Sequence, residues 1–277
     1  MQKEKRTIIY DQDLKIEAYH FSGITQPFAN HFHEYYVIGY LKSGQRFLTC
    51  KNNEYLLKTN SIVIFNPGDN HACKQIDNSY FDYYSLNISK EVIYALTKKL
   101  TGKQYLPIFS NNVIYDQNLT TTLVYLYELI FSQDTSNNKQ MVFFNLIDQL
   151  LQNNQIMQGM LKNESPQIEQ ACKFIDQHYN KHLYLQQICK YTNVSKSTLI
   201  RSFTKTKGIT PYRYLESKRI NEAKKLLEKN LSILDTALQT GFFDQSHFTN
   251  SFIKMIGLAP GYYQKIRLQT KEDHNEK

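Results

Sequence analysis

The spacing of apolar residues in the first part of the chain is typical of β-strands. From about residue 7 to 90, short apolar and aromatic runs alternate with turn residues. Two of these runs are Tyr35–Leu41, which precedes Lys-Ser-Gly-Gln, and Ile62–Phe65, which precedes Asn-Pro-Gly-Asp. Several short strands at this spacing predict a small barrel or sandwich.

Helical spacing replaces this pattern from about residue 89. Apolar residues in 117–132 and 139–158 recur every three or four positions. We predict two consecutive amphipathic helices, which either cover the barrel or pair with a second subunit. The apolar period then lapses at Gly159–Ser165, where we place a hinge. Beyond the hinge we expect helices at about 166–180, 185–192, 196–207, 212–229, 233–240, 245–255 and 260–267.

One pattern occurs twice in the last hundred-odd residues. Each copy has two short apolar-periodic segments with a break between them, followed by Gly-x-x-Pro. The first copy consists of Leu185, Ile188, Val194, Leu199, Phe203, Gly208 and Pro211, and the second of Ile233, Ala237, Phe242, Phe248, Phe252, Gly257 and Pro260. This arrangement is typical of a helix-turn-helix unit. Two units predict a reader of two neighbouring stretches of major groove, with recognition helices about 34 Å apart.

The second helix of the first copy carries candidate base contacts. Ser195 is placed to cap this helix, and Leu199 and Phe203, four residues apart, face inward. The side chains expected to read bases are Ser197, Ile200 and Arg201. An arginine can donate two hydrogen bonds to guanine, which is worth roughly 1–3 kcal/mol of discrimination.

The second copy is built in the same way. Gly241 supplies the turn, Asp244 is the expected N-cap, and Phe242 and Phe252 pack inward. The residues expected to read bases are Gln245, Ser246, Thr249 and Asn250, and Gln and Asn suit adenine edges. An exposed polar residue on a helix is more often merely solvated, so this interpretation depends on the two ordered copies.

The positive charge is concentrated in the segment that holds both copies. The net charge is +8; residues 1–165 hold 15 Lys+Arg and 15 Asp+Glu, whereas residues 166–277 hold 18 and 10, which accounts for the whole excess. A neutral half joined to a basic half indicates a sensor with a polyanion-binding module, although a basic surface kept for solubility has the same composition. The candidate phosphate contacts are Lys196, Lys205, Lys207, Arg213, His247, Lys254, Lys265 and Arg267.

The segment from Gly241 to Phe252, with Gly257, Pro260 and Tyr263 after it, resembles the DNA-binding domain of the AraC/XylS family of bacterial transcription regulators. The resemblance covers residues 181–268. It implies a seven-helix domain that binds promoter DNA and usually activates transcription through RNA polymerase, and its base-contacting positions map to the seven residues named above. The chain departs from the family at Cys189, Thr236 and Ala259, which are packing positions, and at Asn250, where many members have arginine.

Three histidines in the N-terminal part form a second candidate site. His31-Phe32-His33 precedes a strand, and His71 ends the segment Asn-Pro-Gly-Asp-Asn-His, which resembles the two sequence blocks of the cupin fold. His-x-His on a strand places both imidazoles on one face, and a third histidine can complete a metal site. Such a site offers an effector pocket that includes Tyr35.

A carboxylate ligand is missing from this candidate site. Enzymatic cupins supply one a few residues after the second histidine, where this chain has Val37 and Ile38, and Glu34 would point to the opposite face. We therefore expect a pocket without metal or other cofactor. The alternatives are a bound metal ion, or histidines that merely satisfy local hydrogen bonds.

Together these patterns predict an α+β protein of two domains. Residues 1–160 are expected to form a cupin-like barrel with a helical pair that binds an effector or forms a homodimer, and residues 166–270 an all-α domain with two helix-turn-helix units. The predicted function is an effector-responsive transcription regulator, not an enzyme, whose partners are promoter DNA, RNA polymerase and a small molecule. The alternatives are a metal-dependent cupin enzyme and a constitutive DNA-binding protein without ligand.

The cysteines and the N-terminus indicate where such a protein works. The four cysteines form no CxxC pair, which predicts reduced thiols. The N-terminus has charges but no apolar segment of a signal peptide, and no apolar run approaches the roughly 18 residues that span a bilayer. We therefore expect a cytoplasmic protein without a membrane partner.

Overall fold

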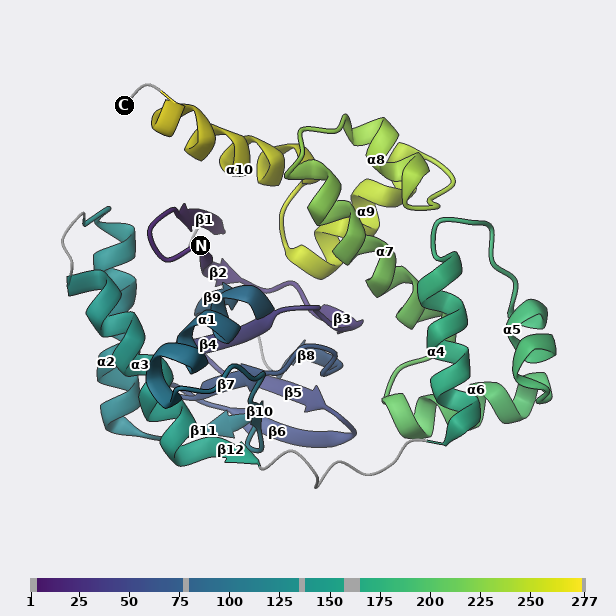
Figure 1. Cartoon of the computed structure of the whole chain (residues 1–277), viewed down its shortest axis with the longest axis horizontal. Coiled ribbons are helices and arrows are strands. Elements are labelled where there is room, and N and C mark those ends of the chain that lie inside the picture. The colour runs from purple at the N-terminus through teal and green to yellow at the C-terminus, as the bar shows by residue number, and fades with distance from the viewer. Residues whose placement is uncertain (1–3, 77–79, 135–137, 157–164, 276–277) are drawn as a thin grey trace.

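The computed structural model describes residues 4–76, 80–134, 138–156 and 165–275. Within these residues, the N-terminal half contains two larger antiparallel sheets, one two-stranded antiparallel sheet and three helices, and the C-terminal half is helical (Figure 1). The expected hinge at Gly159–Ser165 lies outside the described residues except for Ser165, which caps the first helix of the C-terminal half. Within the described part of the chain, no helix is long and apolar enough to cross a membrane.

Two sheets face each other across a cavity. The six-stranded sheet has the order β1 (Lys5–Asp11), β2 (Ile16–Ile24), β9 (Phe81–Ile88), β4 (Tyr36–Ser43), β7 (Ile62–Phe65) and β11 (Val113–Ile114). The four-stranded sheet has the order β3 (Phe28–His31), β8 (His71–Gln75), β5 (Arg46–Cys50) and β6 (Asn53–Leu57). This confirms the β-rich N-terminal domain. The predicted run Ile62–Phe65 is β7, and the run Tyr35–Leu41 lies in β4 except for Tyr35, which precedes the strand.

Both faces of the six-stranded sheet are covered. On β9, Tyr83 and Ser85 point into the cavity, whereas Leu86 and Ile88 pack in the opposite direction against helices. These helices are α1 (Lys90–Thr101), α2 (Gln117–Phe131) and α3 (Asn138–Asn154), so the predicted helical pair covers the sheet. The pattern did not predict α1. The second predicted helix ends at Asn154, because Gln155–Ile156 (β12) pairs with Ile108–Phe109 (β10) instead.

The C-terminal half has the seven expected helices. They are α4 (Pro166–His178), α5 (Leu185–Thr192), α6 (Lys196–Lys207), α7 (Pro211–Leu227), α8 (Ile233–Gln239), α9 (Gln245–Ile256) and α10 (Pro260–Asn275). The repeated Gly-x-x-Pro marks the end of one helix and the start of the next. Gly208 and Gly257 cap α6 and α9 in the left-handed conformation, and Pro211 and Pro260 are the first residues of α7 and α10. The last helix continues well beyond the predicted end at about residue 267.

The two halves share hydrophobic cores. Phe248, Phe252 and Met255 of α9 belong to the same buried cluster as the residues that face the cavity between the sheets. Phe32, from the segment after β3, packs with α4, α5 and α6, and its ring lies 4.9 Å from that of Tyr214. Both helix-turn-helix units therefore pack directly on the N-terminal half.

Candidate DNA-reading face and effector pocket

The first recognition helix, α6, presents the predicted base-reading residues to solvent. The hydroxyl of Ser195 accepts a hydrogen bond from the Thr198 amide at 3.2 Å, which confirms the predicted cap. Leu199 and Phe203 are fully buried. The predicted base-reading side chains, those of Ser197, Ile200 and Arg201, are all exposed. Their exposure fits base contact, and their role stays a prediction.

The second recognition helix, α9, repeats this geometry. Asp244 accepts a hydrogen bond from the His247 amide at 2.7 Å, and Phe248 and Phe252 are fully buried. The predicted base-reading residues lie on the other face, where Gln245, Ser246 and Asn250 are exposed and Thr249 is half-buried. Two helices therefore carry polar, outward-facing side chains suited to a major groove.

The long helix α7 connects the two units. It packs against both α6 and α9, and its buried Glu216 accepts a hydrogen bond from Ser251 of α9 at 2.7 Å. Arg219, also on α7, donates to the carbonyls of Tyr179 at 2.8 Å and Lys181 at 2.9 Å, just after α4. These bonds join α7 to α9 and to the end of α4, and the expected spacing of about 34 Å between the recognition helices stays a prediction.

The predicted phosphate contacts divide into three groups. The exposed ones are Lys196, Lys205, Lys254 and Lys265, and the half-buried ones are Lys207, Arg213 and His247. Arg213 also pairs with Glu216 at 2.6 Å. Arg267 contradicts the prediction in this arrangement: its side chain is 13% exposed and pairs with Glu228 at 3.2 Å and Glu17 at 3.8 Å. Its position near the end of the domain gave no sign that acidic residues would cover it.

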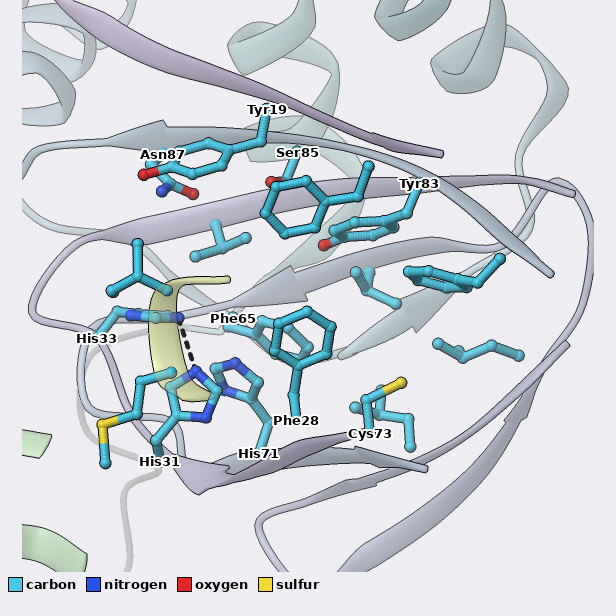
Figure 2. Close-up of a pocket in the computed structure, with 18 of the residues that line it drawn as sticks. Tyr19, Phe28, His31, His33, Phe65, His71, Cys73, Tyr83, Ser85 and Asn87 are labelled. Carbon is cyan, nitrogen blue, oxygen red and sulfur yellow. Dashed lines mark hydrogen bonds between the residues drawn. The ribbon is translucent and has the colours of Figure 1, made fainter. Parts of the chain in front are cut away.

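A cavity of about 100 Å³ between the two sheets is the candidate effector pocket (Figure 2). It includes the four residues predicted for such a pocket, His31, His33, Tyr35 and His71. Most of the wall is apolar or aromatic, and Ser85 and Asn87 lie across from the histidines. No charged side chain among the described residues lines it. A small, largely apolar ligand fits these walls best.

Helix α9 closes part of this cavity. Met255 and Ile256, at the C-terminal end of the second recognition helix, belong to the cavity wall. Their apolar character is equally expected of the core of a helical domain, so the sequence pattern does not distinguish them as cavity residues. A molecule in the cavity would therefore touch the helix whose opposite face carries Gln245 and Asn250.

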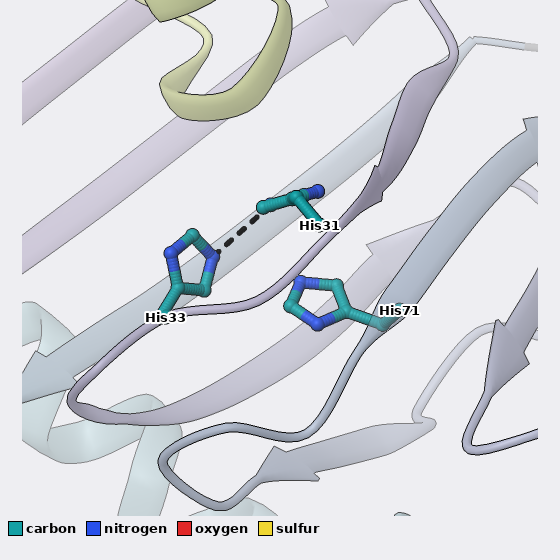
Figure 3. Close-up of side chains that lie close together, drawn as sticks. All are labelled: His31, His33 and His71. Atoms are coloured by element: carbon teal, nitrogen blue, oxygen red, sulfur yellow. Dashed lines mark hydrogen bonds between the residues drawn. The ribbon is translucent and has the colours of Figure 1, made fainter. Parts of the chain in front are cut away.

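The three histidines meet in the cavity wall (Figure 3). Nε2 of His31 lies 3.2 Å from Nε2 of His33, and the ring of His71 stacks on Phe65 at 3.9 Å. Burial lowers the pKa of His31 to about 4 and holds the pKa values of His33 and His71 well below the ordinary value. All three rings are therefore neutral at neutral pH, and each neutral ring keeps one nitrogen as a lone-pair donor.

A buried charge cluster joins the two halves. Glu17 of β2 accepts a hydrogen bond from Lys224 of α7 at 2.9 Å and lies 2.5 Å from the hydroxyl of Tyr263 of α10. The side chains of Glu17 and Lys224 are only 7% and 6% exposed. Burial alone would raise the pKa of Glu17, but the charges of Lys224 and Arg267 outweigh burial and hold it at about 2. Lys224 follows Ile220 by four residues and precedes Leu227 by three, so it lies on the apolar face of α7. A charge on an apolar helix face was the sequence signal that could have indicated this buried cluster.

This pKa gives the contact a defined pH dependence. Because the folded-state pKa of Glu17 is lowered, its stabilisation is complete above about pH 4.5 and is lost as the pH falls towards 2. We expect the wild type to exceed Glu17→Gln in free energy of unfolding by about 3 kcal/mol at neutral pH, and this difference to vanish near pH 2. Urea unfolding between these limits measures the difference. The exposed Glu169, replaced in the same way, should give only a small difference. A difference for Glu17 that does not change with pH would show that it carries no charge-dependent stabilisation.

The N-terminal half also binds the end of each recognition helix. Asn30 and Asn70 donate to the carbonyl of Gly208, the cap of α6, at 2.7 and 3.0 Å. The guanidinium of Arg6 donates to the carbonyl of Gly257, the cap of α9. These two contacts are equivalent by position in the repeat, although different strands and loops provide them. Both recognition helices are therefore tethered at the same point to the domain that contains the cavity.

Comparison with known proteins matches both halves of the chain. The family model of the AraC-like ligand binding domain matches residues 13–143, and that of a helix-turn-helix domain matches residues 188–266. An uncharacterized HTH-type transcriptional regulator of Bacillus subtilis, YbfI, is 41% identical over 249 residues, which cover 89% of this chain and 90% of that protein. The raffinose operon transcriptional regulatory protein RafR of Pediococcus pentosaceus is 25% identical over 272 residues, which cover 95% and 94%.

Solved structures share the two-domain fold. The apo form of a ToxT variant from Vibrio cholerae has a TM-score of 0.56 at 15% identity, covering 91% of this chain and 97% of that one. Wild-type ToxT with an unsaturated fatty acid bound has a TM-score of 0.54 at 16% identity, covering 96% and 98%. At these identities the likeness concerns the fold alone.

Proposed function

The chain belongs to the AraC family of transcriptional regulators, and we propose that it is an effector-responsive activator whose DNA-reading helices are controlled through the cavity between its sheets. The observation that carries this proposal is the place of Met255 and Ile256, which form cavity wall on one side of α9 while Gln245 and Asn250 face solvent on the other. Residues 1–160 would act as the sensor and residues 166–270 as the DNA-binding domain.

The cavity is the natural site for the effector in this proposal. A molecule that enters it contacts the end of α9 as well as both sheets, so its affinity differs between the arrangement described and one in which α9 has moved. A ligand with such a difference in affinity shifts the equilibrium between the two arrangements. The apolar walls favour a small apolar effector, and the fatty acid bound by ToxT is in keeping with that chemistry.

We propose a regulator rather than an enzyme. The support for a regulator is that the two halves of the chain match the AraC-like ligand binding domain and a helix-turn-helix domain. The partners proposed are promoter DNA, RNA polymerase, the effector and a second copy of the chain, in the cytoplasm. A constitutive DNA-binding protein would lack a response to any small molecule, which distinguishes that alternative.

Two substitutions on the recognition helices test the DNA-reading roles. Arg201→Ala should relax sequence preference at one base position and cost roughly 1–3 kcal/mol there, because a paired donor to the base is lost. Lys254→Ala should weaken all sites about equally and reduce the salt dependence of binding by about one unit of slope. Binding to a library of promoter fragments at several salt concentrations measures both. Equal loss of sequence preference in the two variants would contradict the division of roles.

A further inference from the structure

We propose that His31, His33 and His71 form a binding site for a divalent transition-metal ion in the wall of the cavity. This departs from the metal-free pocket expected from the sequence, which rested on the missing carboxylate. The proposal concerns the metal alone and does not require the DNA-binding function.

The ring nitrogens of the three histidines lie close enough together to share one ion. One nitrogen from each histidine lies within 4.8 Å of the other two, and Nε2 of His31 and Nε2 of His33 are 3.2 Å apart. Ligands at about 2.1 Å in a tetrahedral site lie about 3.4 Å from one another. The pair His31–His33 therefore already has the required spacing. The distances to His71 are at most 4.8 Å, so its nitrogen must come closer to the other two by up to about 1.4 Å.

Backbone carbonyls orient two of the three rings. Nδ1 of His31 lies 2.6 Å from the carbonyl of Ala29, and Nδ1 of His71 lies 3.1 Å from the carbonyl of Asp69. A neutral ring that donates from Nδ1 to a carbonyl carries its lone pair on Nε2. Backbone carbonyls hold metal-binding histidines in this way, because the bond fixes both the tautomer and the direction of the ring. Two of the three rings thus have the form that metal ligation requires.

The chemistry of the donor set selects the class of ion. Three imidazoles suit zinc, cobalt, iron, nickel or copper, whereas magnesium and calcium require oxygen ligands. Asp69 is the nearest carboxylate along the chain to His71, but it binds Asn66 and Asn112 and pairs with Lys51. The site is therefore built from nitrogen ligands alone, which leaves at least one coordination position open.

Cobalt(II) is the probe for this site, because its visible absorption bands report the ligands directly. The full chain is treated with a chelator, dialysed and titrated with Co²⁺. We expect one equivalent to bind with the intense bands of a low-coordinate histidine site, and Zn²⁺ to displace them. No saturable bands in the wild type would overturn the proposal.

Substitutions of the histidines test whether the ion binds at this site. His71→Phe keeps a ring that can stack on Phe65, and His33→Gln keeps a hydrogen-bonding group beside His31, so at least one variant should remain folded by circular dichroism. Each is expected to lose the Co²⁺ bands. His182→Phe changes an exposed histidine in the C-terminal half and should bind like the wild type. Bands that persist in folded His71→Phe would overturn the assignment.

DNA binding by the chelator-treated chain separates this proposal from the proposed function. If the metal site fails while the protein still binds its promoter, only the metal proposal is wrong. If Co²⁺ binds as expected while no promoter is recognised, the proposed function is wrong and the metal site stands.

Discussion

Glu17→Ala is expected to break the contact between the two halves of the protein, at a cost of about 3–5 kcal/mol to that contact. The substitution leaves Lys224, whose side chain is 6% exposed, without the carboxylate it binds at 2.9 Å. A buried ammonium without its partner either loses its proton or regains water, and separation of the two domains gives it water. We expect small-angle scattering to give a larger radius of gyration, and an apolar dye to bind where Met255 and Ile256 have left the cavity wall.

The control for this variant is Glu169→Ala. Glu169 pairs with Lys173 at 3.1 Å on the surface of α4, and the two side chains are 60% and 67% exposed. Such exposed pairs contribute about 0–1 kcal/mol, so this variant should scatter like the wild type. A Glu17→Ala protein that stays as compact as the control would show that the apolar contacts hold the halves together without the charge cluster.

Gly241→Ala is expected to be the most damaging small substitution in the C-terminal half. Gly241 has a φ of +81°, and a Cβ there would lie 2.7 Å from the carbonyl oxygen of Tyr179 and 2.9 Å from the backbone carbon of Asn180. The left-handed conformation costs about 1–2 kcal/mol for alanine. Overpacking against backbone adds about 1–3 kcal/mol. Because Tyr179 follows α4, the strain falls between the two helix-turn-helix units.

Gly102→Ala separates the two contributions. Gly102 has a similar φ of +75°, but a Cβ there meets nothing within 4 Å. Urea unfolding should give a loss of only about 1–2 kcal/mol for this control. The Gly241 variant should also bind a two-site promoter less tightly, since its units are displaced. Equal losses of stability in both variants would mean that the backbone near Tyr179 moves to make room for the Cβ at no cost in free energy.

The sequence predicted the seven helices of the C-terminal half, apart from the end of the last one, because its signals are local. Ser195 and Asp244 cap the recognition helices, and glycine and proline mark where helices end and begin. The AraC family and its two-domain fold are confirmed. The base-reading and phosphate-binding roles stay predictions until DNA binding is measured.

The predictions failed where partners are distant along the chain. Glu17 and Lys224 are 207 positions apart, and neither residue alone indicates the other. Arg267 was taken for a phosphate contact because a basic residue in a basic domain is usually exposed, whereas acidic residues from both halves surround it. The same reason applies to the part of the cavity wall that α9 forms, because α9 is distant along the chain from the strands of the two sheets. Long-range pairing is set by the packed fold rather than by any local pattern.

The paired attachments at Gly208 and Gly257 link the positions of the two recognition helices to each other. The N-terminal domain binds the C-terminal end of each recognition helix. Asn30 and Asn70 hold the end of α6, and Arg6 holds the end of α9. A rotation of the N-terminal domain as a rigid body would tilt both recognition helices together, so binding to one DNA half-site alone would be short-lived. A promoter would then be bound at both half-sites or at neither.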